Sequence, residues 1–345
     1  MEEKNEKAVT IDDIARMAGV GKGTVDRVIH NRGRVSQETA DRVNKVIRDL
    51  NYKPNAAARI LGKRKELRIA VIYHNYESEF WQQVEDGIKR AELQYASMGV
   101  RIDRFVLERL DPVKQEEVLE KVSGLGYDGV ALVPYTSEKV ARLINNLVDR
   151  GIPVITFNND EPCRRTAYVG QNLYRSGRTA GELMAMMARQ DAVFVELIAI
   201  CEGMSAFGDR LKGFQEVIDN KRADMVRYGT FTFKEDSAFA YNLTKSLLIS
   251  QNIDAIYVSN VMVETVGEVI RDLEMKHPPL LIGHDITPGI IQYLQEGIIN
   301  VTIGQEPEKQ GYLAIEKICH KLLMDEDISD DIFTKIEIIV SENIP

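Results

Sequence analysis

Residues 10–28 read Thr10-Ile-Asp-Asp-Ile-Ala-Arg-Met-Ala-Gly-Val-Gly-Lys-Gly-Thr-Val-Asp-Arg-Val28. Thr10, with Asp13 three residues later, opens an apolar stripe with three- and four-residue spacing, which is typical of a helix start. Ala18-Gly19-Val20 predicts a sharp turn, because glycine accepts backbone angles that other residues avoid. We expect a second helix over about 21–29, so this stretch predicts two short helices joined by a tight turn.

A third helix over about 37–50 follows Ser36 and carries its own apolar stripe. Three helices with a glycine turn between the first two are typical of a helix-turn-helix unit, whose second helix lies in the major groove of DNA. Lys22 and Arg27 on the outer face of that helix suit this role, because both can donate hydrogen bonds to guanine O6 and N7. A small helical bundle with a solvated charged face is the alternative.

Charge is unevenly distributed along the chain. Residues 1–65 hold 15 Lys and Arg against 9 Asp and Glu, whereas the remainder of the 345 residues holds 29 against 44. The net charge of the whole chain is −9. A basic segment followed by an acidic body indicates that only the first part binds a polyanion.

Asn55-Ala-Ala-Ala-Arg-Ile-Leu61 is a run of good helix formers that is too short to be stable as an isolated helix. We expect it to fold beside its two-fold mate in the minor groove, with Leu61 as an apolar wedge between base steps. A plain interdomain linker is the alternative. The expected domains are residues 8–53, a helix-turn-helix domain, residues 54–66, a hinge helix and linker, and residues 67–345, an effector-binding and dimerisation domain.

Short apolar runs alternate with amphipathic helical stretches from Leu67 onward. This alternation, with nearly continuous apolar strands, predicts parallel sheets covered by helices on both faces. The units are too many for one typical sheet, so we expect two doubly wound α/β subdomains. The expected strands are 68–73, 129–133, 153–157, 193–200, 255–258 and 280–283, with helices such as 80–97, 114–125, 137–150, 176–189, 238–250 and 263–275 between them.

Ligands of doubly wound sheets bind beyond the carboxyl ends of the strands. The segments that follow the expected strands are rich in amides, carboxylates, arginine and aromatic rings, a set that suits a polyhydroxylated ligand. Phe80 and Trp81 can stack on the C–H face of a sugar ring, although Trp81 also fits an ordinary core position. These segments are 76–81, 134–135, 158–160, 202–210, 259–260, 284–285 and position 305.

An ordered series of motifs resembles the lactose-repressor (LacI) family of bacterial regulators. The motifs are Val9-Thr-Ile-Asp-Asp-Ile-Ala-x-x-Ala-Gly-Val, Thr24-Val-x-Arg-Val28, Val35-Ser36, Asn51-Tyr-x-Pro-Asn55, and Ala58 with Leu61. From about Arg68 to Val340 the chain resembles the periplasmic sugar-binding-protein-like core of that family. The resemblance implies an N-terminal all-α helix-turn-helix domain with a hinge helix, followed by two parallel-sheet subdomains of the periplasmic-binding-protein type I kind.

The resemblance also implies roles for individual residues. Lys22, Gly23 and Arg27 correspond to base-reading places, Arg34 to a further DNA contact, and Ala58 and Leu61 to the minor groove. We add Thr10, Thr24 and Asn55 to the expected DNA contacts. The implied ligand contacts are Ser78, Phe80, Trp81, Asn158, Asn159, Arg210, Asn260, Asp285 and Gln305.

The chain departs from the family pattern at several places. Asp26 stands where a neutral residue such as Ser is usual, so we expect it to face a base or to pair with Arg27 or Arg32. Asn158-Asn159 stands where Asp-Arg is common, and Ser78 stands where Asn is common. These departures leave the type of pocket intact and make its specificity a separate question.

Several classes of function are disfavoured by absent motifs. The sequence contains neither a Gly-x-Ser-x-Gly elbow nor a phosphate loop ending in Gly-Lys-Ser/Thr, and its three cysteines and five histidines lack metal-ligand spacing. We therefore expect no enzyme, no metal and no cofactor. The first residues lack the apolar core of a signal peptide, and no apolar run approaches the ~20 residues of a membrane span, so we expect a cytoplasmic protein without a membrane partner.

Together these features predict a DNA-binding transcription regulator, a repressor, whose operator affinity is controlled by a small ligand in the cleft of the C-terminal domain. The expected ligand is a sugar or sugar derivative, and the expected partners are a pseudo-palindromic double-stranded DNA operator and a second copy in a homodimer. The end, 332–344, is strand-like and not a leucine heptad. A regulator with a purine-like or other non-sugar effector or co-repressor is the first alternative, and a solute-binding protein for transport is the second.

Overall fold

The computed structural model describes residues 11–29, 33, 35–50, 66–74, 78–107, 111–200, 207–234, 236–328 and 331–344. The chain divides into two compact units, residues 1–64 and 65–345. We describe each unit by itself.

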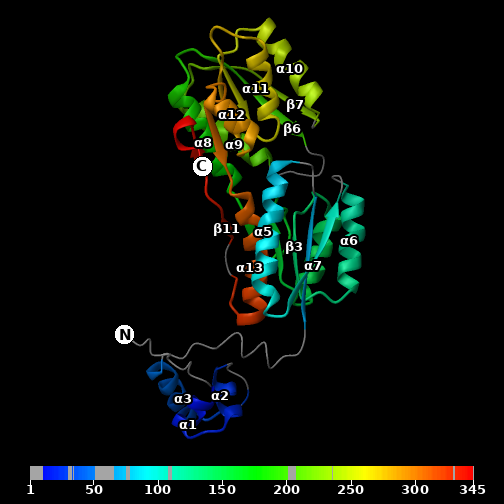
Figure 1. Ribbon diagram of the computed structural model, residues 1–345, viewed down its shortest axis with the longest axis vertical. Coiled ribbons are helices and arrows are strands. Elements are labelled where there is room, and N and C mark those ends of the chain that lie inside the picture. Colours follow the sequence, from blue (N-terminus) through cyan, green and yellow to red (C-terminus); the bar gives the residue numbers. More distant parts are fainter. Residues whose placement is uncertain are drawn as a thin grey trace, which may run out of the picture. The chain divides into compact units, whose positions relative to one another are not determined.

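The described residues of the first unit form three helices around one small core (Figure 1). They are α1 (Ile11–Ala18), α2 (Lys22–Ile29) and α3 (Gln37–Asp49). Gly19 has a φ of +65°, which allows the sharp turn between α1 and α2. Ile14, Val25 and Val43 contribute one side chain from each helix and are fully buried. The predicted pair of short helices joined by a glycine turn is therefore present.

The second unit begins with a sheet in the order β11-β5-β4-β3-β1-β2, and all its neighbouring strands are parallel. Helices α5 and α13 cover one face of this sheet, and α6 and α7 cover the other (Figure 1). The strands are β1 (Leu67–His74), β2 (Val100–Leu107), β3 (Gly129–Leu132), β4 (Val154–Phe157), β5 (Ala167–Gly170) and β11 (Ile332–Phe333). The helices are α5 (Glu79–Ala96), α6 (Pro112–Gly124), α7 (Glu138–Asp149) and α13 (Pro307–Met324).

A second sheet follows in the order β12-β10-β9-β8-β6-β7, with only β12 antiparallel to its neighbour. Helices α8 and α9 pack on one face, and α10, α11 and α12 pack on the other. The strands are β6 (Val193–Ile200), β7 (Val226–Lys234), β8 (Ala255–Val258), β9 (Leu280–His284), β10 (Val301–Gly304) and β12 (Glu337–Ile339). The helices are α8 (Leu173–Met187), α9 (Phe207–Lys221), α10 (Ser237–Ser250), α11 (Val263–Asp272) and α12 (Pro288–Gln295), and a 3-10 turn spans Ser341–Asn343.

The chain passes between the two sheets three times: after β5, after β10 and between β11 and β12. The tail that the sequence predicts as one strand-like run is thus divided into two short strands, one in each sheet. The fold class predicted from the sequence is confirmed. Strands β2, β5, β7 and β10 are additions to the expected set, and β2 and β7 are edge strands of their sheets.

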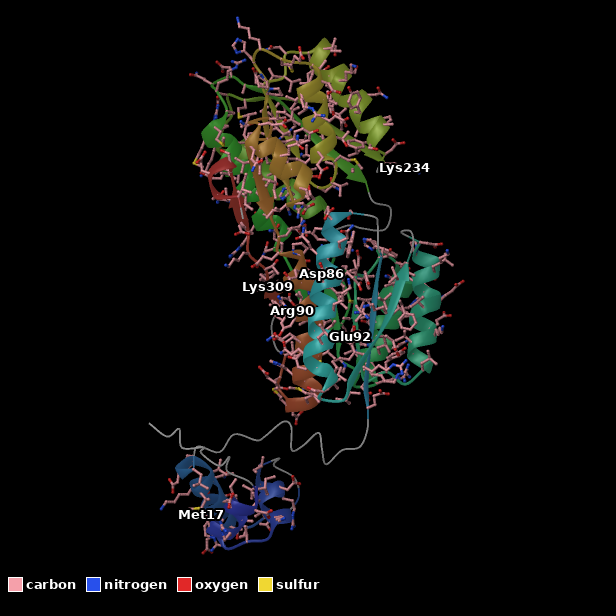
Figure 2. The ribbon with its side chains drawn as sticks, in the orientation of Figure 1. Met17, Asp86, Arg90, Glu92, Lys234 and Lys309 are labelled. Atoms are coloured by element: carbon pink, nitrogen blue, oxygen red, sulfur yellow. The ribbon has the colours of Figure 1, made fainter. Side chains whose placement is uncertain are left out.

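Helices α5 and α13 lie side by side and pack closely through glycine. A Cβ atom on Gly87 of α5 would lie 1.9 Å from the carbonyl oxygen of Glu308. The outer edge of the pair carries charged side chains, among them Arg90 and Lys309 (Figure 2). Arg90 forms an ion pair of 2.5 Å with Glu308, which joins the two helices.

Candidate functional site

The predicted base-reading residues lie on the surface of α2. Lys22, Gly23 and Arg27 are exposed, whereas Thr24 is half-buried. Lys22 Nζ lies 2.6 Å from Asp12 Oδ1, and Arg27 Nε donates to the carbonyl oxygen of Gly23 over 2.9 Å. An exposed ion pair of this kind contributes little to stability, so Lys22 can exchange Asp12 for another partner at small cost.

The remaining predicted DNA contacts lie outside the described residues. They are Thr10, Arg34, Asn55, Ala58 and Leu61. Of the expected hinge helix and linker, 54–66, residues 54–65 also lie outside the described residues. Asp26 is exposed on the same helix as Lys22 and Arg27.

Three predicted ligand residues form a hydrogen-bonded chain, the Arg210 cluster, defined as Arg210, Gln305 and Asp285. Arg210 Nη2 donates to Gln305 Oε1 over 3.2 Å, and Gln305 Nε2 in turn donates to Asp285 Oδ1. Arg210 Nη1 donates to the carbonyl oxygen of Ser259 over 2.7 Å. Because Ser259, Asp285 and Gln305 directly follow β8, β9 and β10, the cluster lies at the carboxyl edge of the second sheet.

The position of Arg210 depends on close packing between α8 and α9. A Cβ atom on Gly177 of α8 would lie 1.7 Å from the carbonyl oxygen of Arg210, and one on Gly213 of α9 would lie 2.1 Å from that of Tyr174. Glycines at both places let the helix backbones approach each other. Arg210 is 1% exposed, so its guanidinium is held beneath the surface at the end of β8.

Burial controls the electrostatics of the cluster. Burial lowers the pKa of Arg210, because the cation loses its hydration. Burial raises the pKa of Asp285, and the hydrogen bond from Gln305 opposes that rise by stabilising the carboxylate. The cluster therefore offers a hydrogen-bond donor and an acceptor that are both poorly solvated, and such groups bind polar atoms more strongly than solvated ones do.

Gln171 and Gln310 extend the cluster and are absent from the predicted site. Gln171 Oε1 accepts from Arg210 Nη2 over 3.5 Å, and its Nε2 donates to the carbonyl oxygens of Gly304 at 2.9 Å and Lys335 at 3.1 Å. One side chain thus connects all three chain passages between the sheets. Gln171 directly follows β5, so the rule that selects residues after strands would have found it, had β5 been identified.

Gln310 brings the predicted residue Asn158 to the same network. Its Nε2 donates to the carbonyl oxygen of Gln305 over 2.8 Å, and its Oε1 accepts from Asn158 Nδ2 at 3.3 Å. Asn158 has a φ of +63°, a conformation that asparagine tolerates better than most residues.

Asn159 and Asn260 are bound to the main chain. Asn159 Nδ2 donates to the carbonyl oxygen of Pro134 over 2.6 Å. Asn260 uses both ends of its amide on Ala199, donating to the carbonyl oxygen at 2.6 Å and accepting from the amide nitrogen at 3.0 Å. These two side chains link segments that are distant in sequence, and the amide of Asn260 is engaged at both ends.

Ser78, Phe80 and Trp81 belong to an aromatic group at the start of α5. Ser78 caps the helix by accepting from the amide nitrogen of Trp81 at 3.5 Å. Trp81 is 6% exposed, and its ring centroid lies 4.2 Å from that of His74 and 5.3 Å from that of the half-buried Phe80. Trp81 is therefore packed as a core aromatic, and Phe80 offers more ring surface to a ligand.

His74 was not selected from the sequence as a site residue. It ends β1, lies beside Trp81 and is 2% exposed. Burial lowers its pKa to about 3, so it is neutral at pH 7. It is a buried structural histidine, as is His284, whose Nε2 lies 3.0 Å from the hydroxyl of Tyr257.

Helix α5 contacts the residue that follows Asp285, because Gln83 Nε2 donates to the carbonyl oxygen of Ile286 over 3.1 Å. The aromatic group and Asp285 therefore lie on neighbouring segments from different sheets. Within the described ranges, no group of three or more His, Cys, Asp or Glu side chains is placed to hold a metal ion. No helix in that part of the chain is long and apolar enough to cross a membrane.

Comparison with known proteins identifies both parts of the chain. Residues 10–55 match the model of the bacterial regulatory proteins of the lacI family, and residues 69–323 match that of a periplasmic binding protein domain. Catabolite control protein A of Staphylococcus aureus (strain MRSA252) is 26% identical over 276 residues, covering 77% of this chain and 81% of that protein. The same protein of Staphylococcus xylosus is 32% identical over 148 residues, 43% of each.

Solved structures share the fold of the second unit. GanP, a glucose-galactose binding protein from Geobacillus stearothermophilus, has a TM-score of 0.73 at 23% identity and covers 82% of this chain and 100% of its own. A solute binding protein from Bacillus halodurans C-125 with bound myo-inositol has a TM-score of 0.74 at 22% identity and covers 82% and 97%. The chain thus belongs to the lacI family of bacterial regulatory proteins and is a DNA-binding transcription regulator, not an enzyme.

Proposed function

We propose that this regulator is a cytoplasmic homodimeric repressor whose operator affinity is set by a sugar or sugar derivative bound at the Arg210 cluster. The observation that carries the proposal is the chain of hydrogen bonds from Arg210 through Gln305 to Asp285. A sugar hydroxyl both donates and accepts, so sugar hydroxyls can bind a guanidinium that only donates as well as a carboxylate that only accepts.

The aromatic group supplies the apolar side of the proposed site. Phe80 is half-buried at the start of α5, and Gln83 of the same helix contacts the segment that follows Asp285. A sugar ring held by its hydroxyls at the cluster would present its C–H face to this aromatic edge. A nucleobase would need flat surfaces on both of its faces, and the nearly buried Trp81 offers little of one.

Gln171 supports coupling between ligand and operator. Its amide contacts Arg210 and the main chain of the other two passages between the sheets. A ligand that pulls on Arg210 would disturb these bonds and so change the angle between the subdomains. Coupling of this kind amounts to ~1–3 kcal/mol between the two sites.

The DNA side of the proposal rests on the exposed face of α2. In a homodimer each copy would place this helix in one major groove of a pseudo-palindromic operator. Lys22 and Arg27 would read bases there, and the segments 54–64 would pair in the central minor groove.

Two measurements test the function. Selection of bound sequences from random duplex DNA should yield a two-fold symmetric site. In a thermal-shift screen against monosaccharides, sugar phosphates, sugar acids, polyols and purines, one sugar class should raise the melting temperature of the protein. Adding that sugar to the operator complex then shows whether the protein releases or retains the DNA. A shift with purines alone would replace the sugar proposal by a purine effector, and asymmetric selected sites would contradict the dimer.

A further inference from the structure

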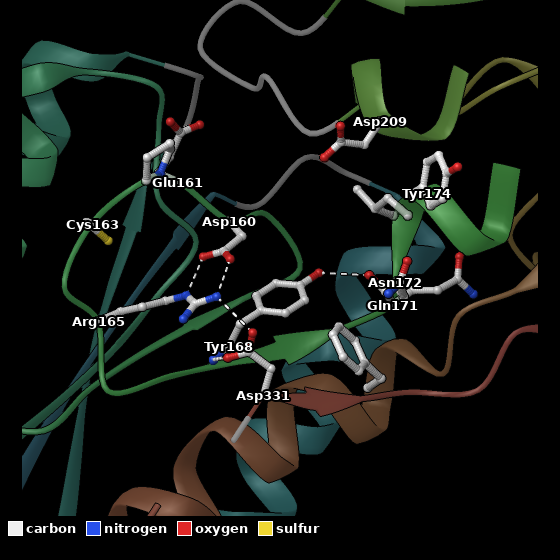
Figure 3. Close-up of a pocket in the computed structure, with 13 residues that line it drawn as sticks. Asp160, Glu161, Cys163, Arg165, Tyr168, Gln171, Asn172, Tyr174, Asp209 and Asp331 are labelled. Carbon is white, nitrogen blue, oxygen red and sulfur yellow. Dashed lines mark hydrogen bonds and ion pairs between the residues drawn. The ribbon is translucent and has the colours of Figure 1, made fainter. Parts of the chain in front are cut away.

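A cavity of about 710 Å³ lies beside the passages between the sheets, and its lining differs from the predicted ligand residues (Figure 3). Cavities of ~300–1,000 Å³ are the usual size of small-molecule sites. We propose that this cavity is a second ligand site, distinct from the Arg210 cluster, and that it binds an organic cation, an amine or amidinium with an apolar body.

The walls carry an excess of negative charge. Asp160, Glu161, Asp209 and Asp331 line the cavity, and among the lining residues that the structure describes Arg165 is the one basic residue. Figure 3 shows Asp160 and Glu161 on one side and Asp209 on the other. A cation placed between them would be attracted from both sides of the cavity.

Arg165 neutralises only part of this charge. Its Nε and Nη2 lie 2.6 Å and 2.5 Å from the two oxygens of Asp160, and Nη2 also lies 3.1 Å from Asp331. Glu161 accepts a hydrogen bond from the hydroxyl of Thr136 at 2.5 Å. The described lining therefore holds four carboxylates against one guanidinium, and the carboxylate of Asp209 is exposed.

Aromatic rings form the apolar part of the wall. Tyr168, Tyr174 and Phe333 line the cavity, and Phe333 is 54% exposed. The guanidinium of Arg165 already lies 5.9 Å from the centroid of the Tyr168 ring, and that of Arg178 lies 5.7 Å from the Tyr174 ring. These ring faces attract cations, so carboxylates and rings together favour a cation that carries apolar surface.

The cavity joins both halves of the second unit. Asp160 and Tyr168 come from the segments around β4 and β5 of the first sheet, whereas Tyr174 and Asp209 come from α8 and α9 on the second. Gln171 lines the cavity and also contacts Arg210. A cation bound here would bridge the two subdomains and contact Gln171, which is hydrogen-bonded to Arg210, whatever ligand the Arg210 cluster takes.

Isothermal titration of the full chain with benzamidine tests the proposal, and benzamide, its uncharged near-isostere, is the matched ligand control. We expect benzamidine to bind with one site per chain and benzamide to give no heat. Absence of benzamidine binding, or equal binding of benzamide, would overturn the proposal.

Two variants locate the binding. Asp209→Asn removes an exposed carboxylate without burying a new group and should weaken benzamidine binding by about tenfold, because one charge-assisted contact is lost. Glu117→Gln removes an exposed carboxylate on α6, away from the lining, and should leave the dissociation constant unchanged. Unchanged binding in Asp209→Asn, or equal weakening in both variants, would show that the cation binds elsewhere.

Discussion

Arg210 and Gln305 are joined by a hydrogen bond of 3.2 Å from the guanidinium Nη2 to the amide Oε1, and both side chains are buried. Gln305 passes the contact on, because its Nε2 donates to Asp285. The elements that carry these residues are far apart in sequence, because three strands and three helices lie between α9 and β10. The arrangement has measurable consequences for binding, stability and pH dependence.

Arg210→Ala should abolish the thermal shift produced by the sugar found in the screen, with affinity falling by about a hundredfold, because charge-assisted hydrogen bonds are lost. Operator affinity without sugar should persist. Arg142→Ala, at an exposed position on α7, is the control and should show the same thermal shift with this sugar as the wild type. A normal shift in Arg210→Ala would reject the Arg210 cluster as the ligand site.

Gln171→Ala should lower the free energy of unfolding by about 1–3 kcal/mol, because the carbonyl oxygens of Gly304 and Lys335 lose a buried donor. Urea denaturation measures this loss. Gln190→Ala removes an exposed glutamine and should change stability by less than about 0.5 kcal/mol. Equal stabilities for the two variants would show that Gln171 does not hold the passages together.

Gly177→Ala should destabilise the protein by about 1–3 kcal/mol, because a methyl group there would lie 1.7 Å from the backbone oxygen of Arg210 and force α8 and α9 apart. The same variant should weaken sugar binding, since Arg210 moves with α9. Gly124→Ala meets nothing within 4 Å and serves as the control in both assays. Wild-type stability in Gly177→Ala would mean that the two helices tolerate a wider separation.

Stability should fall as pH decreases from about 6.5 to about 3, in part because of His74. Burial lowers the folded pKa of His74 from 6.5 to about 3, so in this window the unfolded chain binds a proton that the folded chain does not. One such group contributes a slope of up to about 1.4 kcal/mol per pH unit. His74→Phe should therefore show a shallower decline than the wild type in denaturation at pH 4 to 7, whereas His277→Asn, at an exposed position, should not. Parallel curves for His74→Phe and the wild type would contradict the assignment.

Leu61→Ala should weaken binding to the selected operator by at least about tenfold, because it removes the side chain that we propose as an apolar wedge in the minor groove. Affinity for the sugar should be unaltered, since Leu61 lies outside the second unit. Electrophoretic mobility shift gives the first quantity and the thermal shift the second. Operator affinity equal to that of the wild type would reject the wedge.

Local pattern was sufficient to predict the helix-turn-helix and the parallel α/β body. The stripe around Ile14 and the turn at Gly19 act over a few residues, and fully buried strands such as β3 appear as unbroken apolar runs. Edge strand β2 is absent from the expected set because only three of its eight residues are buried and Arg101, Asp103 and Arg104 interrupt the apolar positions. Its apolar run is therefore interrupted, although it pairs with β1 along its whole length.

Within the site, sequence reasoning selected Arg210, Asp285 and Gln305 from their places after strands and from the family resemblance, and tertiary packing brought them together. Sequence reasoning did not reveal Gln171, whose importance comes from contacts with Gly304 and Lys335, both more than a hundred residues away. Sequence reasoning also could not decide whether Trp81 offers a stacking surface to a ligand or packs in the core. The ring of His74 packs against Trp81, which places Trp81 in the core. Residue type and spacing determine which element forms and where polar groups can gather, because these depend on neighbours in sequence. Burial, hydrogen-bond partners and the second cavity depend on where distant segments meet, and only the folded chain decides that.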